Sequence, residues 1–395
     1  MLRTNKNFER LSQNYLFREV SERVEDFKRQ SGQTDIISLG IGDVSLPLPK
    51  TIAEAFAKTA NEMATEKGFK GYPPTAGYDF LRLAIADKYN KLGAFVQADE
   101  VFVSDGAKSD LTNLLDLFDE PTALVVSPSY PAYVDDNILH GNKVKFLTVT
   151  KEDGFLPRTK NVARASYVIY LCSPNNPTGV AYSEKTLKEW VNFALSTGSV
   201  IIYDGAYEAF IRSDNPKSIF EISGARYCAI EVGSFSKRAG FTGVRCGWSV
   251  IPKDLMVGKR SLTELFLRRQ SAKFNGVSYP VQVAAFAALT EEGVKASEKN
   301  VDYYLNNARL LSDFCDNCGL KRFGGKDAPY LFVKCPDGLN GWEFFHLALT
   351  KAKVVLTPGE GFGVGGEGFV RMTSFGKKEQ VELAVERLSS LIKTM

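Results

Sequence analysis

The segment of this sequence that is best suited to catalysis carries a lysine among small hydroxyl residues and an arginine. Ser234, Ser236, Lys237 and Arg245 follow an apolar run that ends at Val232. Lys237 is therefore expected at the carboxyl end of a strand, where open α/β sheets bind ligands. Hydroxyls and a guanidinium beside an amine are typical of a phosphate anchor next to a nucleophile. A basic surface loop is the alternative interpretation.

Polar groups also follow two other predicted strands. Asp204 comes directly after Val200–Tyr203, with Tyr207 three residues later, and Asn176 follows Tyr167–Leu171 in a turn bounded by prolines. A buried carboxylate at such a position must be paired or hydrogen-bonded, because an isolated buried charge is costly. A helix cap at Asp204 and a plain turn at Asn176 are the alternatives.

Two more segments offer binding sites for anions. A strand ending near Val103 leads through Gly106 into a predicted helix, so the backbone amides of Ala107 and Lys108 can cradle a phosphate. Arg371 stands in an apolar strand-like run, where a guanidinium requires an anionic partner. That partner is either a structural carboxylate or a substrate.

These groups need a sheet to hold them, and the alternation of elements predicts one. Between about residues 36 and 251, short β-branched runs alternate with helical stretches, which is typical of a mostly parallel sheet covered on both faces. The later part of the chain predicts a smaller α+β domain. Its expected elements are a long helix over 280–314, strands at 330–334, 353–356 and 368–372, and a helix over 378–394.

Composition excludes several classes of protein. The chain has 395 residues, of which 44% are hydrophobic and 24% charged, as in ordinary globular proteins with two or three domains. Lys and Arg number 49 against 46 Asp and Glu, which lacks the basic excess of a nucleic-acid-binding protein. No apolar stretch approaches 18 residues and no signal-peptide core is present. We therefore predict a cytoplasmic protein with no membrane or nucleic-acid partner.

A metal site is not expected. Cys315 and Cys318 have the C-x-x-C spacing, but a zinc site needs two more ligands and the sequence contains only two histidines. Gly361–Gly366 matches G-x-G-x-x-G, yet the helix of a dinucleotide site does not follow it. Chemistry based on lysine, arginine, tyrosine and carboxylates is the remaining expectation.

Five motifs, in order along the chain, resemble those of the fold-type I pyridoxal-phosphate (PLP) aminotransferases of class I and II. They are Asn176 in P-N-N-P-T-G, Asp204 and Tyr207 in Y-D-x-A-Y, Lys237 in S-F-S-K, Arg245 in G-x-R-x-G-W and Arg371 in V-R-M-T-S-F. The resemblance implies PLP as cofactor and a homodimer with shared sites. It also implies an α/β fold with a seven-stranded sheet in a PLP domain at 46–280, and a small domain formed by 1–45 and 281–395.

The resemblance implies a role for each matching residue. Lys237 corresponds to the lysine that binds PLP covalently and moves the substrate Cα proton, Asp204 pairs with the pyridine nitrogen, and these two with Tyr207 form the predicted catalytic set. Tyr207 and Asn176 correspond to residues at the phenolic oxygen, and Tyr130 to the aromatic on the ring. The implied phosphate contacts are Ala107, Lys108, Ser234, Ser236, Arg245 and Tyr72 of the partner subunit.

Within this class the chain resembles the LL-diaminopimelate aminotransferase family, in Asn14–Phe17, Ile37–Asp43, Ser129–Asp135, Lys273–Tyr279 and Ala328–Lys334. That family exchanges amino groups between glutamate/2-oxoglutarate and tetrahydrodipicolinate/LL-2,6-diaminopimelate, on the way to lysine and peptidoglycan. The substrates implied are therefore small amino and keto acids. The substrate contacts implied are Tyr15, Gly42, Lys108, Tyr130, Asn176, Asn275 and Arg371, some of them across the dimer.

One position departs from the family pattern. Family members often carry Y-G-x-E-x-G, whose Glu is available for the distal ammonium of the substrate, whereas this chain has Thr75 there. A threonine supplies no charge, so looser recognition and a broader donor range are expected. A broad-specificity amino-acid aminotransferase therefore stays open as an alternative. A PLP carbon–sulfur lyase or related synthase also stays open, because enzymes of that kind on the same fold share Lys237, Asp204, Arg245 and Arg371.

Overall fold

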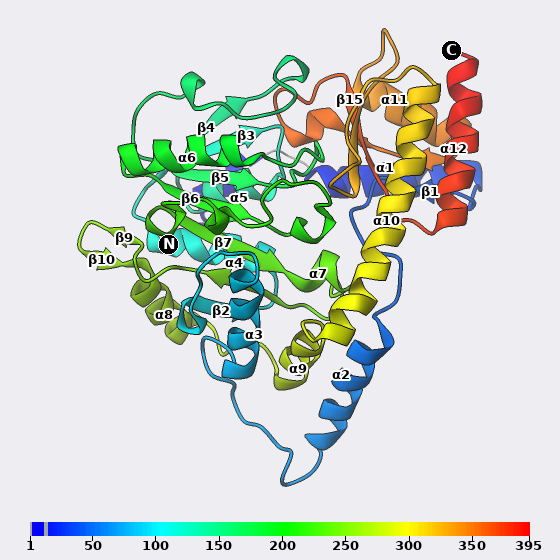
Figure 1. Cartoon of the computed structure of the whole chain (residues 1–395). Coiled ribbons are helices and arrows are strands. Elements are labelled where there is room, and N and C mark those ends of the chain that lie inside the picture. The colour runs from blue at the N-terminus through cyan, green and yellow to red at the C-terminus, as the bar shows by residue number, and fades with distance from the viewer. Residues whose placement is uncertain (1, 12–14) are drawn as a thin grey trace.

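The computed structural model describes residues 2–11 and 15–395. Its centre is a seven-stranded sheet in the order β2-β8-β7-β6-β5-β3-β4 (Figure 1). The strands are β2 (Val101–Ser104), β3 (Thr122–Ser127), β4 (Lys143–Thr148), β5 (Val168–Cys172), β6 (Val200–Asp204), β7 (Ala229–Ser234) and β8 (Gly247–Val250). All neighbours pair in parallel except β8, which is antiparallel to both β7 and β2. The predicted mostly parallel seven-stranded sheet is confirmed.

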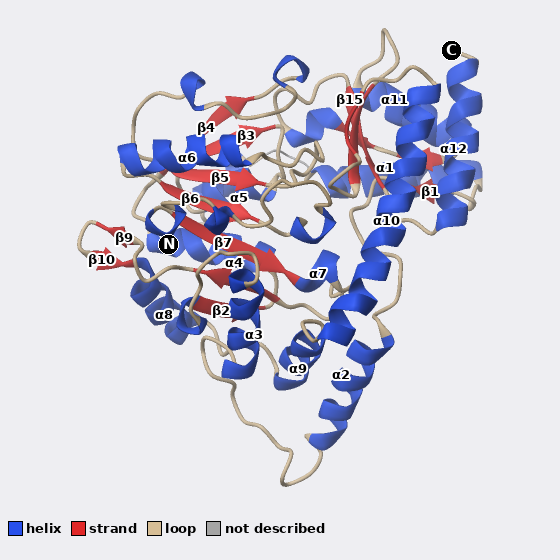
Figure 2. Cartoon of the chain, viewed as in Figure 1, coloured by secondary structure: helices blue, strands red, loops and turns tan. Residues whose placement is uncertain are grey.

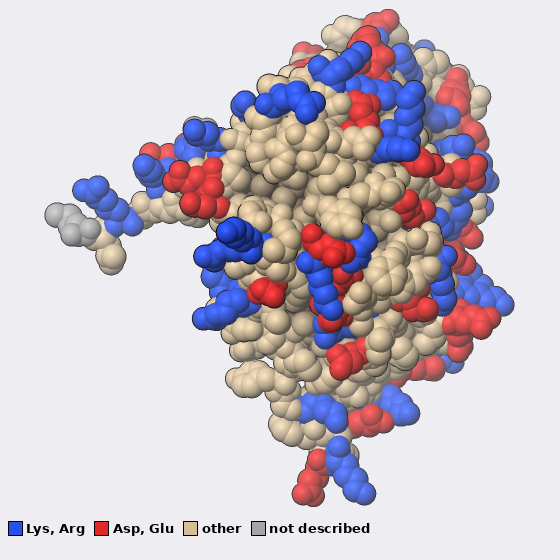
Figure 3. Space-filling model, turned by 60° about the vertical axis from the view of Figure 1, so that its left-hand side comes forward, with Lys and Arg blue, Asp and Glu red and all other residues tan. Residues whose placement is uncertain are grey.

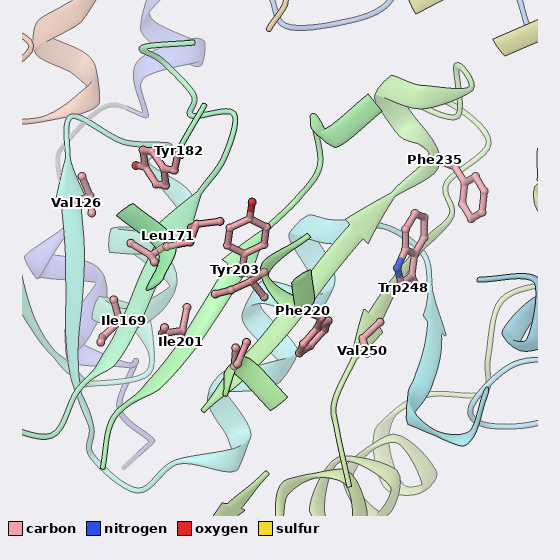
Figure 4. Close-up of a cluster of buried hydrophobic side chains, with 14 of the residues drawn as sticks. Val126, Ile169, Leu171, Tyr182, Ile201, Tyr203, Phe220, Phe235, Trp248 and Val250 are labelled. Carbon is pink, nitrogen blue, oxygen red and sulfur yellow. The ribbon is translucent and has the colours of Figure 1, made fainter. Parts of the chain in front are cut away.

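Helices cover both faces of this sheet (Figure 2) because successive side chains of a strand point to opposite sides. Ile169 and Ile201 pack with Trp190 on one face, whereas Val168 and Ile202 pack with other helices on the opposite face. Figure 4 shows part of the first cluster, from Val126 to Trp248. The helices of this part of the chain are α2 (Lys50–Glu62), α3 (Asp79–Asn90), α4 (Ala107–Asn113), α5 (Ala132–Leu139), α6 (Glu184–Thr197), α7 (Phe235–Arg238), α8 (Leu262–Lys273) and α9 (Tyr279–Ala287).

A second, smaller sheet stands beside the first in the order β11-β12-β15-β14. Its strands are β11 (Arg322–Gly324), β12 (Tyr330–Lys334), β14 (Thr357–Pro358) and β15 (Phe369–Thr373), all antiparallel. Helices α10 (Glu291–Asn317), α11 (Gly341–Leu347) and α12 (Lys378–Lys393) pack against it over a separate apolar core. This is the expected α+β part, and the exact domain boundaries stay a prediction.

The long helix expected over 280–314 is two helices. Helix α9 ends at Ala287, and α10 begins at Glu291 with Thr290 as its N-cap, whose side chain accepts a hydrogen bond from the amide of Gly293. The run of Ala and Leu residues hid this break, because the helical pattern is otherwise continuous. The signal of a new helix was the threonine cap followed by two glutamates.

The first expected strand, near Ile36–Leu39, does not join the large sheet. It forms β1 (Ile37–Ser38), which pairs in parallel with β13 (Val354–Val355). Helix α1 (Leu16–Ser31) precedes it, and Ile37 and Leu39 lie in the apolar core of the smaller part. A short hairpin, β9 (Met256–Val257) with β10 (Arg260–Ser261), completes the strands described. Segments from both ends of the chain thus share one core.

The surface agrees with the nearly balanced composition. On the face drawn in Figure 3, basic and acidic side chains are interspersed. Within residues 2–11 and 15–395, no helix is long and apolar enough to cross a membrane.

Candidate active site

A cavity of about 450 Å³ opens at the carboxyl ends of the large sheet, facing the smaller sheet. Strands β6 and β7 bring Asp204 and Ser234 to its wall, and β15 brings Arg371 from the other side. Most of the predicted site residues line it: Gly42, Ala107, Lys108, Tyr130, Asn176, Asp204, Tyr207, Ser234, Ser236, Lys237, Arg245 and Arg371.

Lys237 lies in α7, the short helix that follows β7. Its Nζ donates a hydrogen bond to the carbonyl of Gly42 at 2.5 Å, so the two segments meet across 195 residues of sequence. Burial lowers the pKa of Lys237 to about 8, and the charges of Arg371 and Arg245 add to this effect although Asp43 opposes it. A substantial fraction of this amine is therefore neutral near physiological pH and able to act as a nucleophile or base.

Asp204 ends β6 as a buried carboxylate. Its Oδ2 accepts a hydrogen bond from the Tyr133 hydroxyl at 2.7 Å, and its Oδ1 accepts one from the Ala206 amide at 3.0 Å. Burial raises the pKa of Asp204, although both hydrogen bonds act in the opposite direction. Both donors in the described chain are neutral, so this carboxylate suits a cationic partner brought in by a ligand.

Arg371 is buried in the middle of β15, with only 1% of its surface exposed. It donates to Asn176 Oδ1 at 2.7 Å and to the carbonyl of Gly40 at 2.5 Å, while its Nε has no hydrogen-bond partner among the described residues. The side chain also lies over the ring of Tyr330, 4.5 Å from its centroid. A buried guanidinium held by neutral acceptors fits an anionic ligand such as a carboxylate.

The part of the cavity beside the ends of β2 and β7 forms an anion cradle. Helix α4 begins at Ala107 after Gly106, which has a φ of +138°, a conformation that favours glycine. Gly106 has no side chain with which to cap the helix. Arg245 donates to Ser236 Oγ at 3.3 Å, and Ser234 Oγ accepts from the Ser236 amide. First-turn amides, two hydroxyls and a guanidinium converge here, a donor set that fits a phosphate group.

Three predicted residues do not line this cavity. Tyr72 is 87% exposed on the long loop between α2 and α3, and Asn275 is exposed near the end of α8. Tyr15 lines a neighbouring cavity, with the Lys108 ammonium 5.3 Å from its ring centroid. Asn14, the first residue of one resemblance motif, lies outside the described residues.

Sequence reasoning missed two tyrosines that support the site. The hydroxyl of Tyr330 is 2.8 Å from that of Tyr207, and Tyr133 donates to Asp204 as described above. Both occur in stretches that resemble the family, and Tyr133 stands three residues after Tyr130 in the sequence. This spacing places both tyrosines near the start of α5, with their ring centroids 5.7 Å apart. The spacing is the sequence signal from which Tyr133 could have been predicted to lie beside Tyr130.

The structure also places the cysteine pair and the glycine-rich segment that the sequence singles out. No group of three or more His, Cys, Asp and Glu side chains there is placed to hold a metal ion. Cys315 is buried, Cys318 partly buried, and both are free thiols. The Gly361–Gly366 segment leads directly towards β15 rather than into a helix.

Comparison with known proteins identifies the family. The pattern described as "Aminotransferase class I and II" matches residues 34–388. Curated relatives named LL-diaminopimelate aminotransferase are similar over 99% of both chains, at 45% identity in Azobacteroides pseudotrichonymphae and 42% in Methanosphaera stadtmanae. The solved L,L-diaminopimelate aminotransferase of Chlamydomonas reinhardtii superposes with a TM-score of 0.94 at 40% identity, covering 98% of each chain. The amine, buried carboxylate and anion cradle of this cavity therefore belong to a PLP-dependent enzyme of the class I and II aminotransferases.

Proposed function

We propose that this enzyme is an LL-diaminopimelate aminotransferase, which exchanges an amino group between glutamate/2-oxoglutarate and tetrahydrodipicolinate/LL-2,6-diaminopimelate. The observation that carries the proposal is the 42–45% identity, over 98–99% of this chain, to relatives that bear that name. The reaction would serve the synthesis of lysine and peptidoglycan precursors in the cytoplasm.

The residues of the cavity fit PLP, which when bound supplies an electron sink for the negative charge that develops at the substrate Cα. Asp204 would hold the protonated ring nitrogen, since its buried carboxylate lacks a cationic partner within the described chain. Tyr207 and Asn176 would donate to the phenolic oxygen, and Tyr130 would lie on the ring. Ala107, Lys108, Ser234, Ser236 and Arg245 would hold the phosphate.

Lys237 would bind the cofactor and then carry the proton. Its pKa of about 8 leaves part of the amine neutral at physiological pH, so Nζ can accept the proton from the substrate Cα and return it on the cofactor side. To do so Nζ must exchange its hydrogen bond with the Gly42 carbonyl for contacts with the ligand.

Arg371 would bind the substrate α-carboxylate with two parallel hydrogen bonds. Asn176 and the carbonyl of Gly40 hold the guanidinium in place, and Nε is available. Fixing the carboxylate in this way orients the Cα–H bond towards Lys237. Tyr15, Gly42, Lys108, Tyr130, Asn176 and Asn275 are the further proposed substrate contacts.

The proposal includes a homodimer whose interface completes the site. Tyr72 and Phe69 are 87% and 66% exposed on the loop between α2 and α3, which suits burial against a second copy of the chain. Mixing Lys237→Ala chains with Tyr72→Ala chains is expected to restore activity in hybrid dimers. If no activity returned although hybrids formed, Tyr72 would act within its own chain or not at all.

Two measurements test the function. The purified protein is expected to absorb visible light, and Lys237→Ala is expected to lose that band or shift it. With LL-diaminopimelate and 2-oxoglutarate, glutamate should form at a kcat/KM well above that for unrelated amino donors. Equal kcat/KM values for many donors would favour a broad-specificity aminotransferase, for which Thr75 is the supporting observation. Release of ammonia with pyruvate would favour a lyase.

A further inference from the structure

A buried ion pair is formed by the two residues that follow Tyr207 and Lys237 in the sequence, Glu208 and Arg238. Arg238, the last residue of α7, donates from Nε to Glu208 Oε1 at 2.9 Å and from Nη2 to Glu208 Oε2 at 3.2 Å. The Glu208 side chain is 5% exposed and the Arg238 side chain 15% exposed. Two parallel bonds of this kind fix both the separation and the relative orientation of the segments that they join.

Those segments are the two that carry the proposed catalytic side chains. Glu208 follows Tyr207 and begins the short helix η6 (Glu208–Phe210), and Arg238 follows Lys237. On its other side Tyr207 is held by the hydroxyl of Tyr330. The ion pair therefore joins the residue directly after Tyr207 to the residue directly after Lys237.

The surroundings of Glu208 keep its carboxylate charged. Burial alone would raise the pKa of Glu208, but the positive charges of Arg238 and Lys88 outweigh it and lower the pKa. Lys88, from α3, places its Nζ 3.5 Å from Glu208 Oε1 and lies over the rings of Tyr89 and Trp248. Positively charged side chains from α3 and α7 thus lie beside the Glu208 carboxylate, and their attraction favours one arrangement of α3, α7 and η6.

Helix α7 depends on such contacts. It has only four residues, too few for its own hydrogen bonds to define its direction. Phe235, the first residue of the helix, packs against Trp248 of β8 with ring centroids 4.9 Å apart. The two side chains are drawn next to each other in Figure 4. Phe235 fixes the start of the helix and Arg238 fixes its end, and Lys237 lies between them.

We propose that Glu208 and Arg238 are a positioning pair that sets the place of the Lys237 amine relative to Tyr207. Neither side chain lines the cavity, so they act through their neighbours and not on the substrate. The inference rests on the proposed role of Lys237 in the reaction. It predicts that weakening the pair harms the chemical step more than substrate binding.

Arg238→Lys tests this, because lysine keeps the charge but cannot form the two parallel bonds. In the holoenzyme we expect kcat to fall about 10- to 100-fold, as for a misplaced catalytic group, with KM for glutamate nearly unchanged. The pH midpoint of the visible absorption band is expected to rise, because a loosened Lys237 nitrogen is better hydrated and its charged form less penalised. Glu208→Gln, which keeps shape but removes charge, should shift both quantities in the same direction.

A matched control is available at Arg226 and Glu100. Arg226 donates to Glu100 Oε1 and Oε2 at 2.6 and 3.2 Å, the Glu100 side chain is fully buried, and neither lines the cavity. Arg226→Lys should lower the melting temperature without moving kcat or the absorption midpoint. If Arg238→Lys behaved like this control, the positioning role would be wrong. A wild-type protein without a visible band would instead refute the proposed function itself.

Discussion

Replacing Arg371 by lysine is the most direct probe of the substrate end of the cavity. The guanidinium is buried, donates to Asn176 and to the carbonyl of Gly40, and has an Nε without a partner in the described chain. Lysine keeps the positive charge but offers one ammonium group in place of a planar fork. The substitution therefore removes geometry and leaves charge.

The size of the effect follows from the bonds that the fork can make. A substrate carboxylate that makes two parallel hydrogen bonds with Arg371 would make only one with the lysine of the variant. A hydrogen bond to a charged group contributes about 1.5–3 kcal/mol. Expressed as transition-state stabilisation, this loss corresponds to a decrease in kcat/KM of roughly 10- to 150-fold. Phosphate binding should be unaffected, because Arg371 is not one of the residues of the anion cradle.

The assay compares kcat/KM for glutamate in the wild type, in Arg371→Lys and in a control variant from the same small sheet. Arg322→Lys is a suitable control, since Arg322 on β11 pairs with Asp316 and does not line the cavity. The visible absorption of the cofactor confirms that each variant is loaded. A kcat/KM for Arg371→Lys within twofold of the wild type would refute the assignment of Arg371 to the carboxylate.

Three further predictions concern pH and packing. Burial raises the pKa of Asp110 to about 7, above the 3.8 of an unfolded aspartate, so its contribution to stability is lost as pH rises from about 4 through 7. The free energy of unfolding of Asp110→Asn, measured relative to wild type in urea titrations, should therefore increase as the pH rises from 5 to 8. A difference between the two proteins that does not change with pH would contradict this. In Gly233→Ala the new Cβ collides with the Trp248 indole, which should cost about 1–3 kcal/mol in the same assay; a loss below about 0.5 kcal/mol would show that the site relaxes freely. Capture of PLP by cofactor-free enzyme should slow about tenfold per pH unit below about 8, since only neutral Lys237 attacks, and a rate independent of pH would argue against a charged resting amine.

Much of the site was predictable because its chemistry follows strands. Asn176, Asp204 and Lys237 each come shortly after an apolar run, and parallel strands bring their carboxyl ends to one edge. Only the local pattern is needed to expect that these three side chains meet. The cavity contains all three, as that reasoning requires.

The contacts that join distant segments were not predictable from the pattern. Tyr133 and Asp204 are 71 residues apart, and Tyr207 and Tyr330 are 123 apart, so nothing local relates them. The ion pair of Glu208 with Arg238 belongs to the same class, since either charge alone suits a solvated surface. Such partners are chosen by tertiary packing, which a single sequence does not display.

The pairing of β1 with β13 has a consequence for how the enzyme is made. Ile37 lies opposite Val354, and translation at about 5–20 residues per second separates their appearance by roughly 15 to 60 seconds. During that interval Ile37 and Leu39 have no core to enter, whereas the strands of the large sheet from β2 to β8 are all synthesised before β13 begins. The nascent chain can therefore build its large sheet first, while the N-terminal strand β1 waits without its partner and exposes unpaired backbone groups until β13 is made.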